Sequence, residues 1–79
     1  MSNITISVKS CDTDLLEGAL KLASTRNRIN HDMAMLFLAE GEIELFKKYN
    51  AKAIDYTAQV LTIENELTRR LEVSLYEAA

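Results

Sequence analysis

The spacing of apolar residues changes once along this chain, close to Ser10. Before that point apolar and polar residues alternate: the apolar set is Ile4, Ile6 and Val8, and the polar set is Thr5, Ser7 and Lys9. A two-residue period is typical of a β-strand with one buried face, so we predict a strand over residues 1–10. A lone strand leaves backbone N–H and C=O groups unpaired, so we expect it to pair with the same strand of a second chain.

After Ser10 the apolar residues recur at spacings of three and four, which is the helical period. We predict helices over residues 12–26, 31–49 and 51–77. Asp12 or Thr13 caps the first helix, polar and basic residues from Thr25 to Asn27 end it, Asn30 caps the second helix, and Asn50 ends the second. The expected fold class is mainly α, with a short N-terminal strand followed by two or three helices. Residues 1–79 form one small domain, which we expect to assemble as an intertwined or coiled-coil homo-oligomer.

The boundary at Asn50 has an alternative. No Pro or Gly lies between Gly41 and Ala79, and the three-four alternation runs unbroken from residue 36 to residue 71. One long coiled-coil helix would place Asn50 and Glu64 as polar positions in its seam. We favour a helix hairpin, because a small chain buries more surface by folding back on itself.

Two glycines, Gly18 and Gly41, lie inside the helical patterns. Each costs about 1 kcal/mol relative to Ala in a helix interior. Two interpretations stay open for each glycine: a close helix–helix crossing that needs a bare backbone, or a tolerated position on the surface.

The small size of the chain favours self-association. A chain of 79 residues without Trp buries only roughly 60% of its unfolded surface, and its core is marginal alone. We therefore expect a homo-oligomer held by the strand and by the apolar stripe of the last helix. The predicted interface residues are Ile4, Ile6, Val8, Tyr56, Val60, Ile63, Leu67 and Leu71.

The chain carries little catalytic equipment. Its single cysteine, Cys11, and single histidine, His31, do not make a metal cluster of the usual spacing within one chain. A Cys–His nucleophile and base is disfavoured, because Asp12 and Asp14 oppose an electropositive setting for the thiol. Two glycines do not make a phosphate-binding loop. We predict that the protein is not an enzyme and uses no cofactor or metal, and that Cys11 is structural.

Several features predict a cytoplasmic protein. A lone cysteine fits a reducing compartment, and the N-terminus lacks a basic region followed by an apolar run. The longest apolar stretch, from Met33 to Ala39, is too short to span a bilayer. The acidic, Trp-free helices also do not suit a membrane surface. We expect no contact with membranes.

Charge and composition together favour binding to another protein. The net charge is −3, and the first 31 residues carry four basic and three acidic side chains against five and nine in the remainder. The C-terminal part therefore does not attract anionic partners. The chain has an excess of apolar helical surface and no catalytic motif. We favour a homo-oligomeric regulator, adaptor or inhibitor that binds a protein target, of the kind that phages encode.

A second hypothesis comes from a resemblance. Residues 4 to about 48 read ITISVKS, DTDLLEGALKLAS, TRNRIN and HDMAMLFLAEGEIELFKKY, and this pattern resembles ribbon-helix-helix repressors and antitoxins. The resemblance implies a DNA-binding transcriptional regulator, in which paired strands enter the major groove and the second helix presents its N-terminus, near His31 and Asp32, to phosphate. The implied DNA-binding residues are Thr5, Ser7, Lys9, Arg26 and Arg28.

Overall fold

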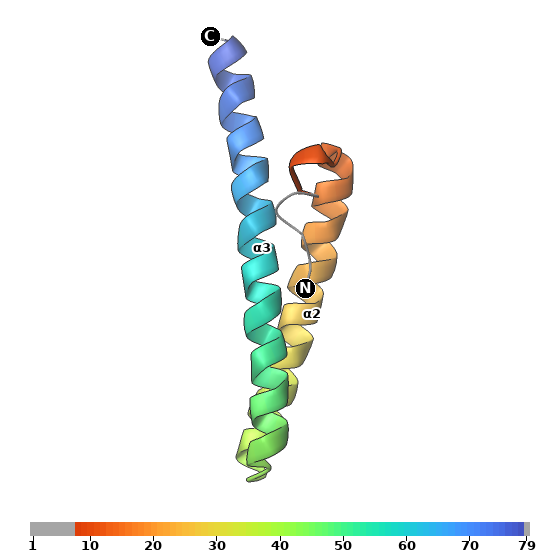
Figure 1. Ribbon diagram of the computed structural model, residues 1–79, viewed down its shortest axis with the longest axis vertical. Helices are drawn as coiled ribbons and strands as arrows, with labels where there is room; N and C mark the ends of the chain where they lie inside the picture. Colours follow the sequence, from red (N-terminus) through yellow and green to blue (C-terminus); the bar gives the residue numbers. More distant parts are fainter. Residues whose placement is uncertain (1–7, 79) are drawn as a thin grey trace.

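The chain folds as an antiparallel hairpin of two long helices (Figure 1). The structure is a computed structural model and describes residues 8–78. Helix α2 spans Thr13–Ala39 and helix α3 spans Ile43–Ala78. Residues 8–10 are also helical and lie beside the open end of the hairpin. The molecule measures 55 × 24 × 15 Å along its principal axes, so it is an elongated rod.

The mainly α class is confirmed, but the predicted strand is wrong where the structure describes it. Residues 8–10 are helical, and no strand occurs within residues 8–78. The Val8 side chain is only 4% exposed and packs with Leu16 and Ile63, one from each long helix. Contact with two helices at once overrides the alternating pattern at this position. Ile4, Ile6 and the other strand positions before Val8 lie outside the described residues.

The predicted break at residues 27–30 is also wrong, because α2 runs through it. The amide nitrogen of Asn27 donates to the Ala53 carbonyl oxygen at 2.7 Å and to the Thr57 hydroxyl at 2.5 Å. The amide of Asn30 donates to the Arg26 carbonyl oxygen at 2.8 Å. These asparagines therefore have partners within the hairpin, and no Pro or Gly interrupts the helix.

The predicted hairpin between residues 31–49 and 51–77 is wrong, because Asn50 lies inside α3. The turn that joins α2 to α3 lies at residues 40–42. Gly41 adopts φ 77°, a left-handed conformation that favours glycine. Its N–H donates to the Leu38 carbonyl oxygen at 3.1 Å, and the Glu42 N–H donates to that of Phe37 at 2.9 Å. This pair of bonds is the Schellman pattern, which ends α2.

The structure also decides between the alternatives left open for the single long helix and for the two glycines. Asn50 lies inside α3, while Leu36 and Ala39 lie on α2, so the single long helix is wrong. Gly41 is needed for the turn and not for a helix crossing. An added Cβ at Gly18 would meet nothing within 4 Å, so Gly18 is a surface position.

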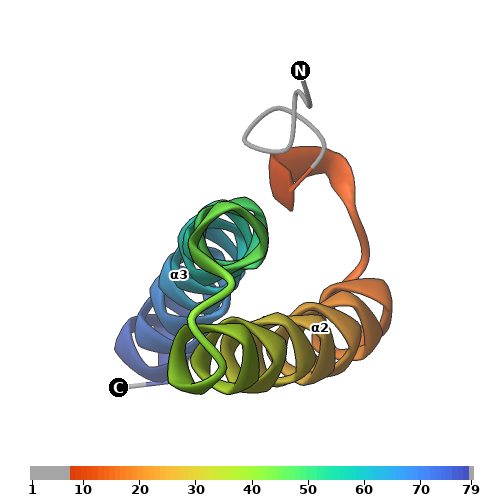
Figure 2. The ribbon, with the colours of Figure 1, turned by 90° about the horizontal axis from the view of Figure 1, so that it is seen from below.

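The two inner faces follow a coiled-coil repeat, in which the Phe37 and Tyr49 rings stack next to the turn at a centroid distance of 5.5 Å. The inner positions are 16, 20, 23, 27, 30, 34 and 37 on α2, and 46, 49, 53, 56, 60, 63, 67 and 70 on α3. Ala34 and Ala53 are buried in the lower half, whereas Leu16 and Ile63 fill the upper half. The helices diverge toward the open end, where residues 8–10 occupy the space beside them (Figure 2).

Candidate functional site

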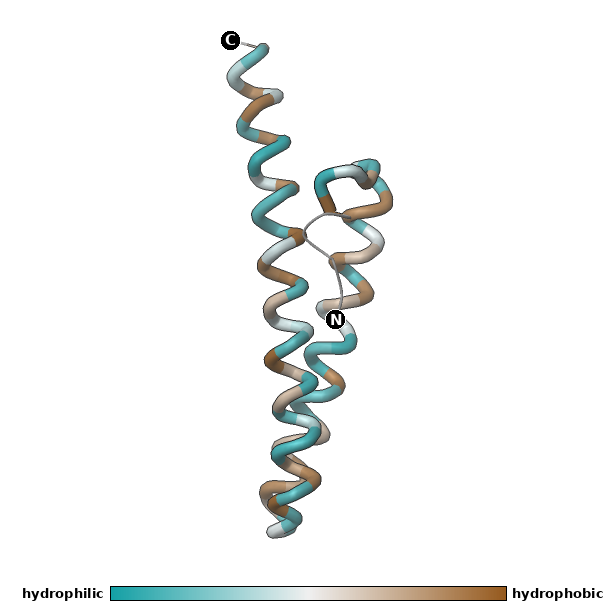
Figure 3. Tube along the Cα trace, viewed as in Figure 1, coloured by the Kyte–Doolittle hydropathy of each residue, from teal (hydrophilic) through white to brown (hydrophobic). Residues whose placement is uncertain are grey.

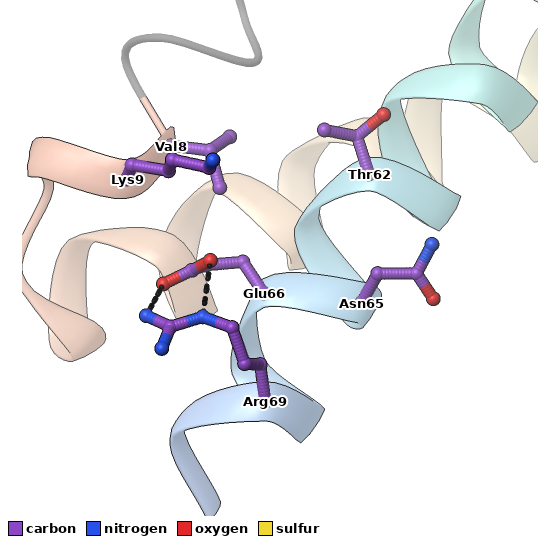
Figure 4. Close-up of a pocket in the computed structure, with 6 residues that line it drawn as sticks. All are labelled: Val8, Lys9, Thr62, Asn65, Glu66 and Arg69. Carbon is purple, nitrogen blue, oxygen red and sulfur yellow. Dashed lines mark hydrogen bonds and ion pairs between the residues drawn. The ribbon is translucent and has the colours of Figure 1, made fainter. Parts of the chain in front are cut away.

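An open depression of about 310 Å³ lies where residues 8 and 9 meet α3 (Figure 4). It is lined by Val8, Lys9, Thr62, Asn65, Glu66 and Arg69. At its base the Glu66 carboxylate, 6% exposed, accepts hydrogen bonds from Arg69 Nε at 3.1 Å and from Arg69 Nη2 at 2.7 Å. Figure 4 shows the two side chains turned toward each other as a bidentate pair.

Arg70 extends this pair into a network that joins three segments. Its Nε donates to Glu66 Oε2 at 2.7 Å. Its Nη2 donates to the carbonyl oxygens of Val8 and Lys9 at 3.1 and 3.4 Å, and its Nη1 donates to the Thr13 hydroxyl at 3.2 Å. Arg70 therefore ties α3 to the end of the N-terminal helical segment and to the start of α2.

The electrostatics of this network suit a structural role. The hydrogen bonds from Arg69 and Arg70 lower the pKa of Glu66 from 4.5 to about 2. The bond to Glu66 in turn raises the pKa of Arg69. A carboxylate that stays ionised and already accepts three hydrogen bonds does not exchange protons near neutral pH. We therefore interpret the network as a clamp on the N-terminal segment.

The other side chains considered for metal binding or catalysis are not grouped into a site among the described residues. Among residues 8–78, no group of three or more His, Cys, Asp or Glu side chains is placed to hold a metal ion. Cys11 packs against the core near the start of α2, and His31 lies about 27 Å further along that helix by its rise per residue. The structure therefore does not bring this thiol and this imidazole together.

The phosphate site implied by the ribbon-helix-helix resemblance is wrong. His31 and Asp32 lie in the interior of α2, so no helix N-terminus is available there. Arg26 and Arg28 are also inside this continuous helix, and Lys9 lines the depression. Thr5 and Ser7 lie outside the described residues. DNA binding stays a prediction, without the geometry that motivated it.

Most of the residues predicted for the oligomer interface pack inside the hairpin of a single chain. Tyr56, Val60, Ile63 and Leu67 occupy inner positions of α3 and face the hairpin, with Ile63 only 2% exposed. Val8 is equally enclosed, and Ile4 and Ile6 lie outside the described residues. A second chain cannot contact Val8 or Ile63 while this fold persists. Leu71 is the one described member that stays open, at 60% exposed.

The apolar surface that remains open forms two defined features, and the first is on α2. Four large side chains recur at steps of seven on its outer face, and we call them the α2 ridge: Leu15, Leu22, Ile29 and Leu36. Each is between 50% and 62% exposed. A seven-residue apolar repeat is the pattern of a coiled-coil seam, so α2 carries one seam toward α3 and a second that is unpartnered in this chain.

The second feature is the end of α3. Arg70 is level with Thr13, the first residue of α2, so residues 71–78 project beyond the hairpin (Figure 1). We call this segment the α3 overhang. Its apolar residues are Leu71, Val73, Leu75 and Tyr76, exposed by 60%, 43%, 63% and 87%. Figure 3 shows that the projecting end carries apolar positions in addition to polar ones.

Sequence reasoning missed the two features for different reasons. The steps of seven from Leu15 to Leu36 are visible in the sequence, but a predicted helix end at residue 26 divided them. The overhang has no signal of its own, because its exposure depends on where α2 begins relative to α3. Only the paired helices define that level.

Comparison with known proteins gives no relative: no family model matches the chain, and no curated protein or solved structure shows a significant match. Within residues 8–78, neither long helix contains a stretch apolar enough to cross a membrane.

Proposed function

We propose that this chain is a non-enzymatic, homo-oligomeric protein-binding module, which regulates, adapts or inhibits a target protein through the α3 overhang. The observation that carries the proposal is the exposure of Leu75 and Tyr76, at 63% and 87%, on a helix end that no other described segment covers. Scattered apolar residues are common on protein surfaces, but contiguous apolar patches mark interaction sites.

The geometry of the overhang suits insertion into a groove. Leu71 and Leu75 are four residues apart and share one face, while Val73 and Tyr76 are three apart and share another. A helix that projects alone can be enclosed by a hydrophobic groove of the target, with side chains at these spacings as anchors. Tyr contributes a large apolar area and a hydroxyl that tolerates a wet rim. The overhang also bears Glu72 and Glu77, so we expect a groove with basic edges.

The test is capture of the target by the immobilised full-length chain from extract of its natural host, with and without nuclease treatment. The variant Leu75→Gln/Tyr76→Gln removes the two most exposed anchors and keeps good helix formers. The matched control, Glu72→Gln/Glu77→Gln, changes the same segment without removing apolar area. We expect stoichiometric capture of one protein, at least tenfold weaker for the first variant and within a few-fold of wild type for the control.

Two results would contradict the proposal. Equal capture by both double variants would remove the overhang from the binding surface. Capture that disappears on nuclease treatment would assign the binding to nucleic acid and favour the DNA-binding hypothesis. Circular dichroism of each variant confirms that the hairpin is still folded.

A further inference from the structure

The α2 ridge has a counterpart on the other side of the hairpin. Ile54 and Leu61, seven residues apart on α3, are 63% and 53% exposed. We call them, with the short side chains of Thr57 and Thr68, the α3 ridge. Each α2-ridge residue comes one position before an inner residue, whereas Ile54, Leu61 and Thr68 come one position after one. Because the helices are antiparallel, this offset places the two ridges on opposite sides of the molecule.

The surface depressions confirm that placement. Leu61 lines a depression with Ser24, which follows an inner residue of α2. The depression formed with Val8 is lined instead by Thr62, Glu66 and Arg69, which each precede an inner residue of α3. Residues on α3 that follow the inner positions, as the α3 ridge does, are thus away from the side that residues 8–10 occupy.

The flanks of the two ridges carry opposite charges. Lys21, Arg26 and Arg28 lie beside the centre of the α2 ridge, and Asp55 and Glu64 lie beside the α3 ridge. None of these five has an ion-pair partner among residues 8–78. Asp32, the one acidic residue beside the centre of the α2 ridge, lies 4.0 Å from His31 Nδ1, so the centre of that ridge keeps an excess of positive charge. A partner for the centre of the α2 ridge therefore needs a helix with apolar residues seven apart and acidic flanks. The pair Ile54 and Leu61 on α3 of another copy, with Asp55 and Glu64 beside it, supplies both.

The residues of the two ridges also lie at matching heights along the hairpin axis. Hydrogen bonds place Asn27 level with Thr57, and Thr13 level with Arg70. Counting from these pairs, Leu22 is level with Leu61, and Ile29 is level with Ile54. A copy placed alongside at the same height would bring these apolar residues together.

The charged flanks match at the same height. Arg26 falls within two residues of the level of Asp55, and Lys21 within two residues of the level of Glu64. At about 1.5 Å of rise per residue, long basic side chains bridge that offset.

From this match we infer that copies of the chain associate side by side in a heterologous (head-to-tail) contact. The α2 ridge of one copy packs against the α3 ridge of the next. The occupant of the α2 ridge is thus a second copy of this chain. This inference rests on the proposed function only in taking the protein to be a homo-oligomer. Such a contact is heterologous and leaves one ridge free at each end, so assembly continues past a dimer, as a closed ring or an open row.

The assembly has a consequence for target binding. All copies point the same way in a head-to-tail contact, so their α3 overhangs project from one end, side by side. The contact levels end below Leu71, so the overhang stays uncovered. Several target-binding segments on one edge raise the effective affinity for an oligomeric or repeated target.

Charge reversal tests the contact by sedimentation velocity at about 100 μM protein. Variant one is Lys21→Glu/Arg26→Glu, and variant two is Asp55→Lys/Glu64→Lys. We expect the wild-type chain, 8.9 kDa per copy, to form species larger than a dimer. For each variant alone we expect a monomer fraction at least tenfold larger than that of wild type. An equimolar mixture restores the assembly, because each reversed surface then meets its complement.

The inference is overturned if wild type sediments as a monomer or a dimer. It is also overturned if variant two alone assembles as wild type does, which would indicate an α2–α2 contact, or if the mixture stays monomeric. Target capture is a measurement independent of assembly, since neither variant changes the overhang. Retained capture by a wild-type chain that does not assemble overturns this inference and the homo-oligomeric part of the proposed function, but leaves the overhang as the binding surface. Assembly without capture contradicts the overhang as the binding surface and leaves this inference standing.

Discussion

Replacement of Ile63 by Ala is the most direct test of how the hairpin is held together. Ile63 is 2% exposed and belongs to the cluster that joins α2, α3 and the N-terminal segment through Leu16 and Val8. Leu20 and Leu67 pack around that cluster. The truncation leaves a void that long helices cannot close without moving past one another.

The expected loss can be worked from these contacts. Removing the buried methyl and methylene groups of Ile typically costs about 2–5 kcal/mol. Ala is a better helix former than Ile by about 0.4 kcal/mol, which offsets a little of the loss. We expect Ile63→Ala to lower the free energy of unfolding by about 3 kcal/mol. A chain of this size has about 4–12 kcal/mol in total, so the variant is near the limit of folding.

The assay is urea unfolding followed by circular dichroism at 222 nm, with Leu75→Ala as the matched control. Leu75 lies on the same helix but is 63% exposed, so we expect its replacement to change stability by less than about 0.5 kcal/mol. With a slope of about 1 kcal/mol per molar urea, the Ile63→Ala midpoint falls by about 3 M. Measurements at two protein concentrations separate folding from association. Equal midpoints for the two variants would refute the packing of this cluster.

Two further predictions follow from the backbone and from the buried carboxylate. Gly41→Ala should lower the free energy of unfolding by about 1 kcal/mol because φ is 77°, whereas Gly18→Ala should raise it by about as much, since its Cβ meets nothing within 4 Å; thermal unfolding measures both, and a gain from Gly41→Ala would contradict the turn. The folded-state pKa of Glu66, about 2, is below its ordinary value of 4.5, so its contribution is fully present above pH 4.5 and is lost as pH falls toward 2. Glu66→Gln should flatten the dependence of stability on pH in that window, and identical pH profiles for variant and wild type would show that the clamp does not form.

The start of α2 and the helical character of the chain after it were determined locally. Asp12 precedes α2 as its N-cap residue, as the sequence indicated, although its side chain makes no capping hydrogen bond. From there the three-four spacing of apolar residues specifies a helix whose stripe must be covered, and a second stripe downstream supplies the cover. A short chain with two such stripes buries both of them by folding back on itself.

The ends of the elements depended on which groups found partners. The polar run near Asn27 was interpreted as a helix end, yet Asn27 donates across the seam to the Ala53 carbonyl oxygen and remains helical. Gly41 was a visible stop signal that the apolar pattern around it obscured. At Val8, contact with both long helices decided the local structure against an alternating sequence.

The surfaces that matter for function were decided only by the tertiary structure. The sequence contains the apolar repeat from Leu15 to Leu36, but whether such a repeat is core or surface depends on which stripe α3 covers. The overhang at residues 71–78 exists because α3 is longer than α2 and both are aligned by the turn at Gly41. Periodicity specifies that a face is apolar, and the relative length and alignment of packed helices specify whether that face remains open to a partner.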